Sequence, residues 1–234
     1  IYGDYDGDGI TSVSILKMFF NKINKNCNYY IPNRLKEGYG LNKYAIDSIK
    51  DNCDLLITVD CGISNLEEVE YLNENNVDVI ITDHHQCGSL LPNSLAVLNP
   101  NREDCNYPFK KLAGVGVVFK LVQALSMKLD VELDYSEILP IVAIGTITDV
   151  VPLISENRII VKSGLDAMKE TKNLGLRALI ETCGLKGKNI NSYHIGFVIG
   201  PRLNAAGRLN SANLGVELFL SESYDKAVEY AQIL

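Results

Sequence analysis

The sequence opens with three aspartates at alternate positions, Asp4, Asp6 and Asp8, set among three glycines. Carboxylates held this close repel one another strongly. Such clusters persist when a bound cation offsets their charge, and the glycines let the backbone turn tightly around it. The motif therefore predicts a metal-binding loop between a strand ending at residue 3 and a helix that follows.

An EF-hand calcium loop is the alternative interpretation, because it also begins with the pattern D-x-D-x-D-G. An EF-hand places a bidentate Glu at loop position twelve, which is Ile15 if Asp4 is position one. The residues before the motif also have a strand pattern, whereas an EF-hand loop follows a helix. Both observations disfavour the calcium loop.

More metal-binding side chains follow two predicted strands at the point where each strand ends. Asp60 comes directly after the apolar run 55–59, and Asp83, His84 and His85 follow the run 77–82. The carboxyl ends of parallel strands meet at one sheet edge, where ligands bind. A mixed set of Asp and His suits Mn²⁺, and a carboxylate-rich set also admits Mg²⁺. A helix N-cap is the alternative role of a single strand-end aspartate such as Asp83.

Asp149 lies inside the apolar stretch 138–154. A carboxylate buried there without a partner would be costly. We therefore expect it either to cap a helix or to supply a metal ligand from a fourth segment of the chain.

Basic residues concentrate in one part of an acidic chain. The formal net charge is −7, yet residues 158–208 hold nine Lys/Arg and three Asp/Glu, which leaves −13 for the rest. Arg202 and Arg208 stand near a glycine-bounded turn and can grip phosphate bidentately. Such asymmetry indicates that one part of the chain holds cations while another meets an anion. Solvated surface arginines are the alternative explanation.

Strand and helix patterns alternate in the first half of the chain, which predicts a mainly parallel sheet flanked by helices in an α/β fold. Helical patterns dominate the second half. We expect strands at 1–3, 29–31, 55–59, 77–82 and 96–98, and helices at 11–23, 42–51, 66–75, 112–128, 136–148, 158–170, 176–183, 192–202 and 223–234.

No linker rich in Pro, Gly or Ser divides the chain, so we expect a single catalytic domain over 1–234. Its α/β part would span about 1–110, its helical part about 111–222, and the start of a connecting helix about 223–234. The six cysteines form no C-x-x-C pair, which disfavours structural zinc. Free thiols in a reducing cytoplasm are the simplest interpretation.

Four segments together resemble the motifs of the DHH phosphoesterase superfamily: 3–12 (GDYDGDGITS), 59–62 (VDCG), 82–85 (TDHH) and 145–152. Within it the chain is most similar to the RecJ family of single-strand-specific exonucleases. Segments 34–41 (RLKEGYGL), 112–120 (LAGVGVVFK) and 200–208 (GPRLNAAGR) carry that closer resemblance. Many RecJ sequences have a His where this chain has Tyr2, so the resemblance assigns no role to that position.

The resemblance implies two bound metal ions, Mn²⁺ or Mg²⁺. Asp60 would bridge them and His85 would face the scissile phosphate, so these two residues carry the expected catalytic roles. The remaining ligands would be Asp4, Asp6, Asp8, His84 and Asp149, with Asp4 a ligand or its close neighbour. Arg202, Asn204 and Arg208 would contact nucleic acid.

The resemblance also implies 5′→3′ hydrolysis of single-stranded DNA by a two-metal mechanism in DNA repair and recombination, with a single-strand-binding protein or a helicase as partners. RecJ proteins carry DHH-associated and OB-like domains, which we expect to lie outside this chain. Two alternatives remain open. One is a small-substrate phosphodiesterase of the superfamily, such as an oligoribonuclease, a cyclic-dinucleotide phosphodiesterase or a pyrophosphatase. The other is a non-catalytic RecJ-like scaffold, which would typically have lost metal ligands.

Overall fold

The computed structural model describes residues 1–208 and 212–234, and of residue 208 the backbone only. Four parallel strands form one sheet in the order β1-β2-β3-β4. Their bounds are β1 (Tyr2–Gly3), β2 (Leu55–Val59), β3 (Asp78–Thr82) and β4 (Ala96–Leu98). The predicted parallel sheet is confirmed. The strand expected at 29–31 is wrong in extent, because only Tyr30 pairs, in a single bridge to Tyr2.

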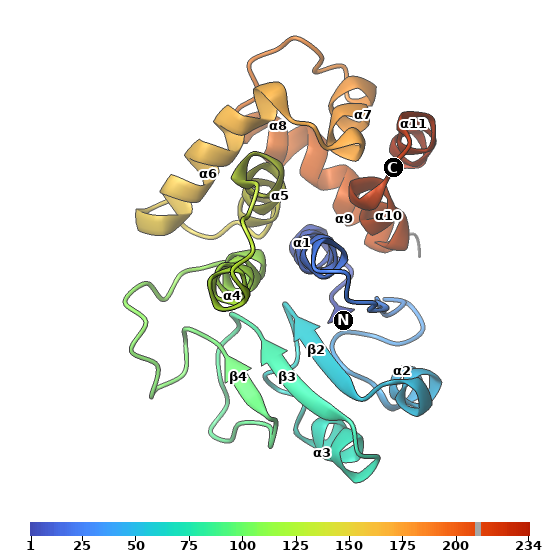
Figure 1. The fold of residues 1–234 in the computed structure, drawn as a ribbon, viewed down its shortest axis with the longest axis vertical. Coiled ribbons are helices and arrows are strands. Elements are labelled where there is room, and N and C mark those ends of the chain that lie inside the picture. The colour runs from blue at the N-terminus through green and yellow to red at the C-terminus, as the bar shows by residue number, and fades with distance from the viewer. Residues whose placement is uncertain (209–211) are drawn as a thin grey trace.

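Helices cover both faces of the sheet (Figure 1). Helices α1 (Gly7–Lys22) and α4 (Gly114–Leu129) lie on one face, and α2 (Lys43–Ile49) and α3 (Leu66–Glu74) on the other. Successive strand residues point to opposite faces, so Leu56 enters the core under α2 and α3 while Ile57 and Val59 enter the core under α1 and α4. Burial on both faces explains why β2 is apolar without alternation.

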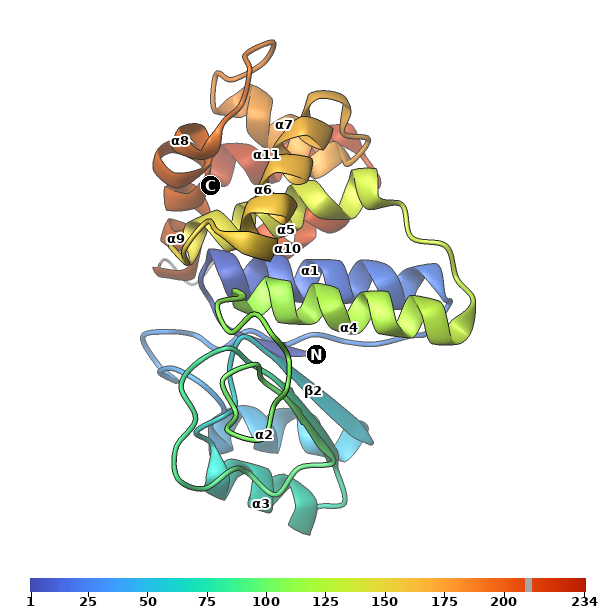
Figure 2. The ribbon, with the colours of Figure 1, turned by 90° about the vertical axis from the view of Figure 1, so that its left-hand side faces the viewer.

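The second half of the chain is helical and packs on α1 through α5 and α10. Figure 2 shows α1 and α4 as a layer between the sheet and these helices. Their bounds are α5 (Tyr135–Thr148), α6 (Ser155–Ala167), α7 (Leu174–Thr182), α8 (Ser192–His194), a π-helical turn (Ile195–Ile199), α9 (Gly200–Arg208), α10 (Ala212–Leu220) and α11 (Tyr224–Ile233).

Helix α10 was not predicted, because it has only nine residues and just two of them, Asn213 and Glu217, are polar. Helix α11, expected as the start of a connecting helix, packs against α7 and α10. No helix in the described ranges is both long and apolar enough to cross a bilayer.

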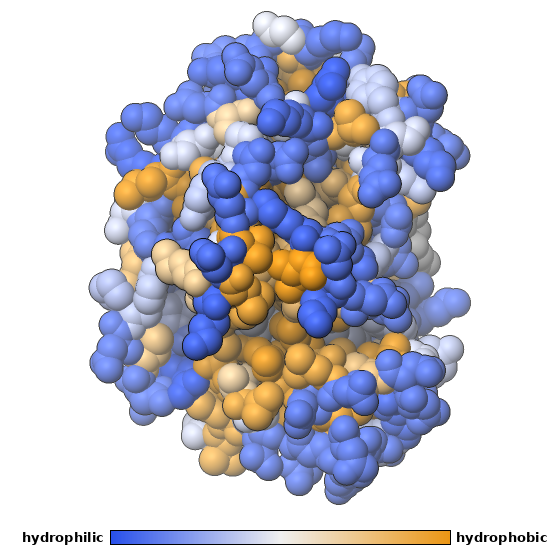
Figure 3. Space-filling model, viewed as in Figure 1, coloured by the Kyte–Doolittle hydropathy of each residue, from blue (hydrophilic) through white to orange (hydrophobic). Residues whose placement is uncertain are grey.

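Apolar side chains gather at the centre of the face shown in Figure 3, over the end of α4 and the adjoining sheet. Leu55, Met127 and Leu129 are among the exposed apolar residues of these elements. Between β4 and α4 lies a cavity of about 390 Å³, lined in part by Val97 and Leu121.

The close approach of α7 and α10 gives a test of the helical packing. A Cβ at Gly175 would overlap the carbonyl oxygen of Leu218. We expect Gly175→Ala to destabilise the fold by about 1–3 kcal/mol, because neither backbone can yield without strain. Urea unfolding measures the loss. Gly88→Ala is the control, since its new Cβ would meet no atom nearer than 3.7 Å; equal midpoints for both variants would contradict this packing.

Candidate metal centre

The register of the sheet brings the predicted strand-end residues into one row. Gly3 pairs with Val59, and Val59 pairs with Thr82. The next residue of each strand is an aspartate: Asp4, Asp60 and Asp83. All three are at least 95% buried. The expectation that these strand ends converge at one sheet edge is therefore realised in the fold.

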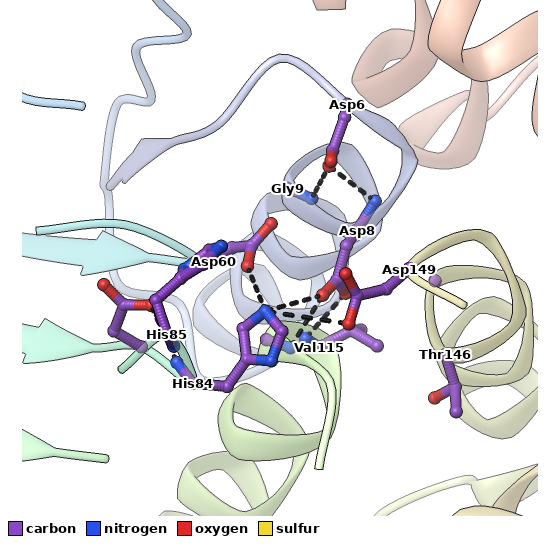
Figure 4. A network of polar contacts seen from close by, with 12 residues as sticks. Asp6, Asp8, Gly9, Asp60, His84, His85, Val115, Thr146 and Asp149 are labelled. Atoms are coloured by element: carbon purple, nitrogen blue, oxygen red, sulfur yellow. Dashed lines mark hydrogen bonds and ion pairs between the residues drawn. The ribbon is translucent and has the colours of Figure 1, made fainter. Parts of the chain in front are cut away.

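Two helix N-termini hold the aspartates of the opening motif (Figure 4). Asp6 is the N-cap of α1, and its Oδ1 accepts hydrogen bonds from the backbone N–H groups of Asp8 and Gly9. Asp8 accepts from the N–H groups of Gly114 and Val115, at 2.7 and 2.8 Å. A helix N-terminus favours negative charge, so α4 stabilises the Asp8 carboxylate from across the fold. The strand that precedes the motif also rules out the EF-hand interpretation.

His84 stands at the centre of the cluster. Its Nε2 lies 3.2 Å from Asp60 Oδ1, 3.6 Å from Asp149 Oδ2 and 3.9 Å from Asp8 Oδ2. Asp149 is the C-cap of α5, so it both ends a helix and turns its carboxylate to this cluster. Helix α5 thus supplies the expected fourth segment.

Three atoms in this cluster are buried without a hydrogen-bond partner in the described part of the chain: Asp60 Oδ1, His84 Nε2 and Asp149 Oδ2. Buried polar atoms are normally satisfied, and an unsatisfied one costs about 1–3 kcal/mol. Three such atoms that face one another fit a cation that would coordinate all of them. The donor set, carboxylate oxygen with imidazole nitrogen, suits Mn²⁺.

Three overlapping sets of side chains have ligand atoms within 4.8 Å of one another. They are Asp4, Asp6 and Asp60; Asp8, His84 and Asp149; and Asp60, His84 and His85. Asp60 and His84 each belong to two sets. The fold therefore brings together all six side chains expected to bind metal.

Burial and mutual repulsion shift the pKa values of these groups. Burial, with the nearby Asp6 carboxylate, raises the pKa of Asp4 to about 7. Burial, with the Asp8 carboxylate, raises the pKa of Asp149 to about 7. Burial likewise raises the pKa of Asp60 and lowers the pKa of His84. A neutral imidazole is the form that binds metals.

Asp83 has a different role from its neighbours. Its carboxylate accepts hydrogen bonds from the backbone N–H groups of Ile63, His84 and His85, and Oδ1 lies 2.7 Å from His85 Nδ1. Although burial opposes it, the hydrogen bonds from His85 lower the pKa of Asp83. The N-cap interpretation of Asp83 is wrong, because no helix follows it. Asp83 instead holds in place the backbone of both histidines and the ring of His85.

Sequence reasoning assigned no role to Tyr39, which the fold places beside the cluster. Its hydroxyl lies 3.2 Å from His85 Nδ1 and donates to the Asp60 carbonyl oxygen at 3.3 Å. Gly38 and Gly40 on either side adopt positive φ, which glycine accepts readily. The segment 34–41 was singled out by resemblance alone, and that was the only signal for this residue.

Helix α9 carries the residues expected to meet nucleic acid. The Oδ1 of Asn204 accepts a hydrogen bond from the N–H of Gly7 at 2.7 Å, and Arg202 Nη1 donates to the carbonyl of Val198. The Arg208 side chain lies outside the described residues. Asn204 thereby ties the basic stretch directly to the first turn of α1, which carries Asp8 and is capped by Asp6.

Residues 1–146 match the model of the DHH family, N-terminal domain. The chain belongs to the DHH family. It is 46% identical over 232 residues to the single-stranded-DNA-specific exonuclease RecJ of Bacillus subtilis, in a match that covers 99% of this chain and 29% of that protein. The corresponding protein of Escherichia coli is 38% identical, over 97% of this chain and 42% of the relative.

Solved structures of the same kind superpose closely. A crystal structure of exonuclease RecJ bound to manganese matches with a TM-score of 0.90 and 37% identity, over 98% of this chain and 58% of the other. The structure of RecJ from Thermus thermophilus in complex with Mn²⁺ matches with a TM-score of 0.85 and 35% identity, over 98% of this chain and 33% of the other. The chain spans less than half the length of the curated relatives from Bacillus subtilis and Escherichia coli.

The raised carboxylate pKa values predict an unusual pH dependence of stability. Asp4 and Asp149 have folded-state pKa values of about 7 against an ordinary value of 3.8, so between these values the folded state binds more protons. Stability without metal should therefore fall as pH rises from about 4 to 7, by on the order of 4 kcal/mol per group over the whole range. Urea unfolding in chelator at pH 5.5 and 8 measures this.

Two controls accompany the pH series. Asp149→Asn should flatten the slope, because it removes one of the titrating groups. Added Mn²⁺ should restore stability at pH 8 by binding the ionised carboxylates. A metal-free protein whose stability rises steadily from pH 5.5 to 8 would contradict the buried carboxylate cluster.

The hydrogen bonds of Asp83 predict a loss of metal affinity when it is removed. We expect Asp83→Ala to weaken Mn²⁺ binding by about 10–100-fold, the usual effect of losing a residue that orients ligands. Calorimetric titration measures the dissociation constant, and circular dichroism checks the fold. The exposed Asp78 on the same strand provides the control variant Asp78→Ala. Unchanged affinity in a folded Asp83→Ala protein would show that Asp83 does not hold the histidines.

Proposed function

We propose that this chain is the catalytic domain of a metal-dependent exonuclease that hydrolyses single-stranded DNA in the 5′→3′ direction. The observation that carries the proposal is the set of buried, unpartnered ligand atoms on Asp60, His84 and Asp149. Such a set is suited to cations and to phosphodiester hydrolysis. The RecJ relatives, specific for single-stranded DNA by name, support the substrate, and the family resemblance supports the direction.

The proposed ligands of two Mn²⁺ or Mg²⁺ ions are Asp4, Asp6, Asp8, Asp60, His84 and Asp149, with Asp60 shared. Bound ions of this kind polarise the phosphate and lower the pKa of the attacking water. The manganese-bound RecJ structures support the choice of metal. All six positions hold a metal-binding side chain, which disfavours the scaffold alternative.

His85 and the basic segment would act on the substrate itself. The contact between His85 Nδ1 and Asp83 leaves Nε2 on the other side of a ring that is 45% exposed. From there it would donate a hydrogen bond to the scissile phosphate and stabilise the charge that develops on it. Arg202, Asn204 and Arg208 would contact the DNA backbone, which gives a salt-dependent affinity.

The parent protein would act in the cytoplasm, in DNA repair and recombination, and a single-strand-binding protein or a helicase would present the DNA. We further propose that DHH-associated and OB-like domains complete it, and that residues 1–234 form one domain with an α/β part to about 110, a helical part to about 222 and a connecting helix from about 223.

Removal of the shared ligand tests the two-metal scheme. Asp60→Ala should lower Mn²⁺-dependent hydrolysis of single-stranded DNA by more than the roughly 100-fold typical of a residue that only orients ligands. Fluorescence of released nucleotides gives the rate, and thermal melting confirms folding. The exposed Asp51 supplies the control Asp51→Ala. Full activity in Asp60→Ala would refute the scheme.

A comparison of substrates with the unaltered protein distinguishes the remaining alternatives. A single strand labelled at either end should lose the 5′ label first. Faster hydrolysis of dinucleotides, cyclic dinucleotides or pyrophosphate than of the single strand would support the small-substrate enzyme instead. Release of the 3′ label first would contradict the proposed direction.

A further inference from the structure

Two aromatic rings stand on the protein surface within the basic stretch 158–208. Tyr193 is 62% exposed and Phe197 is 71% exposed. Their ring centroids lie 4.9 Å apart, with 31° between the ring planes. The residues are four apart, so their side chains share one face of the helical segment. Large rings left in water at such close spacing form a ready surface for another flat ring.

The backbone beneath the pair is anchored. Ile195 and Ile199 on the opposite face are fully buried, and a Cβ at Gly196 would contact Ile147 of α5. The intervening turn, Ile195–Ile199, is π-helical. Single π-helical turns re-aim side chains and occur often at functional sites. The rings therefore project from a rigid base.

The exposed row continues from the rings toward the metal centre. Pro201, the next residue at this spacing, is also exposed, and Asn204 beyond it binds the N–H of Gly7. Seven residues separate Phe197 from Asn204, a rise of about 10 Å. In Figure 2, α8 and α9 lie on the same side of the molecule as the first turns of α1 and α4. A strand of a few nucleotides could span from the rings to the site.

The charge of this segment suits an anionic strand. Residues 184–208 contain Lys186, Lys188, Arg202 and Arg208 and no Asp or Glu, although the chain as a whole carries −7. Lys186 is paired with Glu181 of α7 at 2.7 Å, so the positive charge offered to a strand rests on the other three residues. Surfaces that bind single strands combine a positive track for the backbone with aromatic rings for the bases.

We propose that Tyr193 and Phe197 form a stacking platform for bases of the single strand on its path to the metal centre. The inference rests on the proposed exonuclease function and adds the surface that recognises unpaired bases. Stacking needs a free π-face, so the platform also favours single strands over duplex. It is tolerant of sequence, because every base offers such a face.

The test compares Phe197→Ala and Tyr193→Ala with Phe197→Trp, which keeps a ring, and with Ile159→Ala, an exposed apolar residue of α6. Each alanine variant should raise the KM for a single strand of about 20 nucleotides by about 10-fold, the effect of losing one stacked base. Phe197→Trp and Ile159→Ala should keep the KM of the unaltered protein. Hydrolysis of bis(p-nitrophenyl) phosphate, too small to reach the rings, should be equal in all five proteins.

Abasic substrates sharpen the test. Single strands with one abasic position, moved along the first six nucleotides, should raise KM for the unaltered protein at one or two positions. The same substitutions should have no effect in Phe197→Ala, because the stacking partner is already gone. An abasic penalty that is unchanged in Phe197→Ala, or a KM unaffected by either alanine substitution, would overturn the platform.

The outcomes also separate this inference from the proposed function. If the unaltered protein hydrolyses both the chromogenic diester and the DNA, and the alanine variants have the same KM for DNA, only the stacking platform is wrong. A loss of thermal stability in Phe197→Ala with an unchanged KM would indicate that the ring only supports the fold, and would also overturn the platform. If the unaltered protein hydrolyses neither substrate, the proposed function itself fails.

Discussion

The fold is organised around a group of carboxylates that it forces together out of water. Two unit charges about 4 Å apart repel by about 4 kcal/mol at an effective dielectric constant of about 20, and at least four aspartates share this edge of the sheet. The protein partly offsets that cost with backbone N–H groups from the first turns of α1 and α4. The unpartnered atoms that remain are those best placed for a cation.

That constraint explains several local features that are otherwise unfavourable. Asp60 adopts φ of 61°, a left-handed conformation that is uncommon for residues with a side chain, although Asp accepts it more readily than most. Gly114 must lack a side chain, because a Cβ there would overlap Asp60 Oδ1. Both features let α4 approach β2 closely enough for its N-terminus to reach Asp8. The strain at Asp60 and the glycine at the start of α4 are thus parts of one arrangement.

The helical half of the chain takes part in the same site. Helix α5 ends at Asp149, whose carboxylate faces His84. Helix α9 is bound to the first residue of α1 through Asn204 and Gly7, and a Cβ at Gly207 would overlap the carbonyl of Tyr5 in the loop before α1. A segment rich in positive charge is thereby held against one rich in negative charge. The proposed DNA path and the metal centre are coupled through a single short loop.

The sequence by itself determined the parallel sheet, the positions of most helices and the residues gathered at the metal centre. Strand ends can be read from apolar runs, and parallel strands align their carboxyl ends, so Asp4, Asp60 and His84 were predictable neighbours. The family resemblance supplied the closer roles. Helix α10 was missed because it is short and carries only two polar residues, and the single bridge at Tyr30 because one residue pair leaves no periodic signal.

Only the tertiary structure decided which role each of these residues has. Asp83 looks in sequence like the other strand-end aspartates, yet three N–H groups surround its carboxylate and make it an anchor for the histidines. Asp8 is stabilised by a helix that begins 106 residues away, and Tyr39 meets His85 across 46 residues. Hydrogen bonds over such distances depend on how helices pack on the sheet, and no local pattern of residue types encodes them.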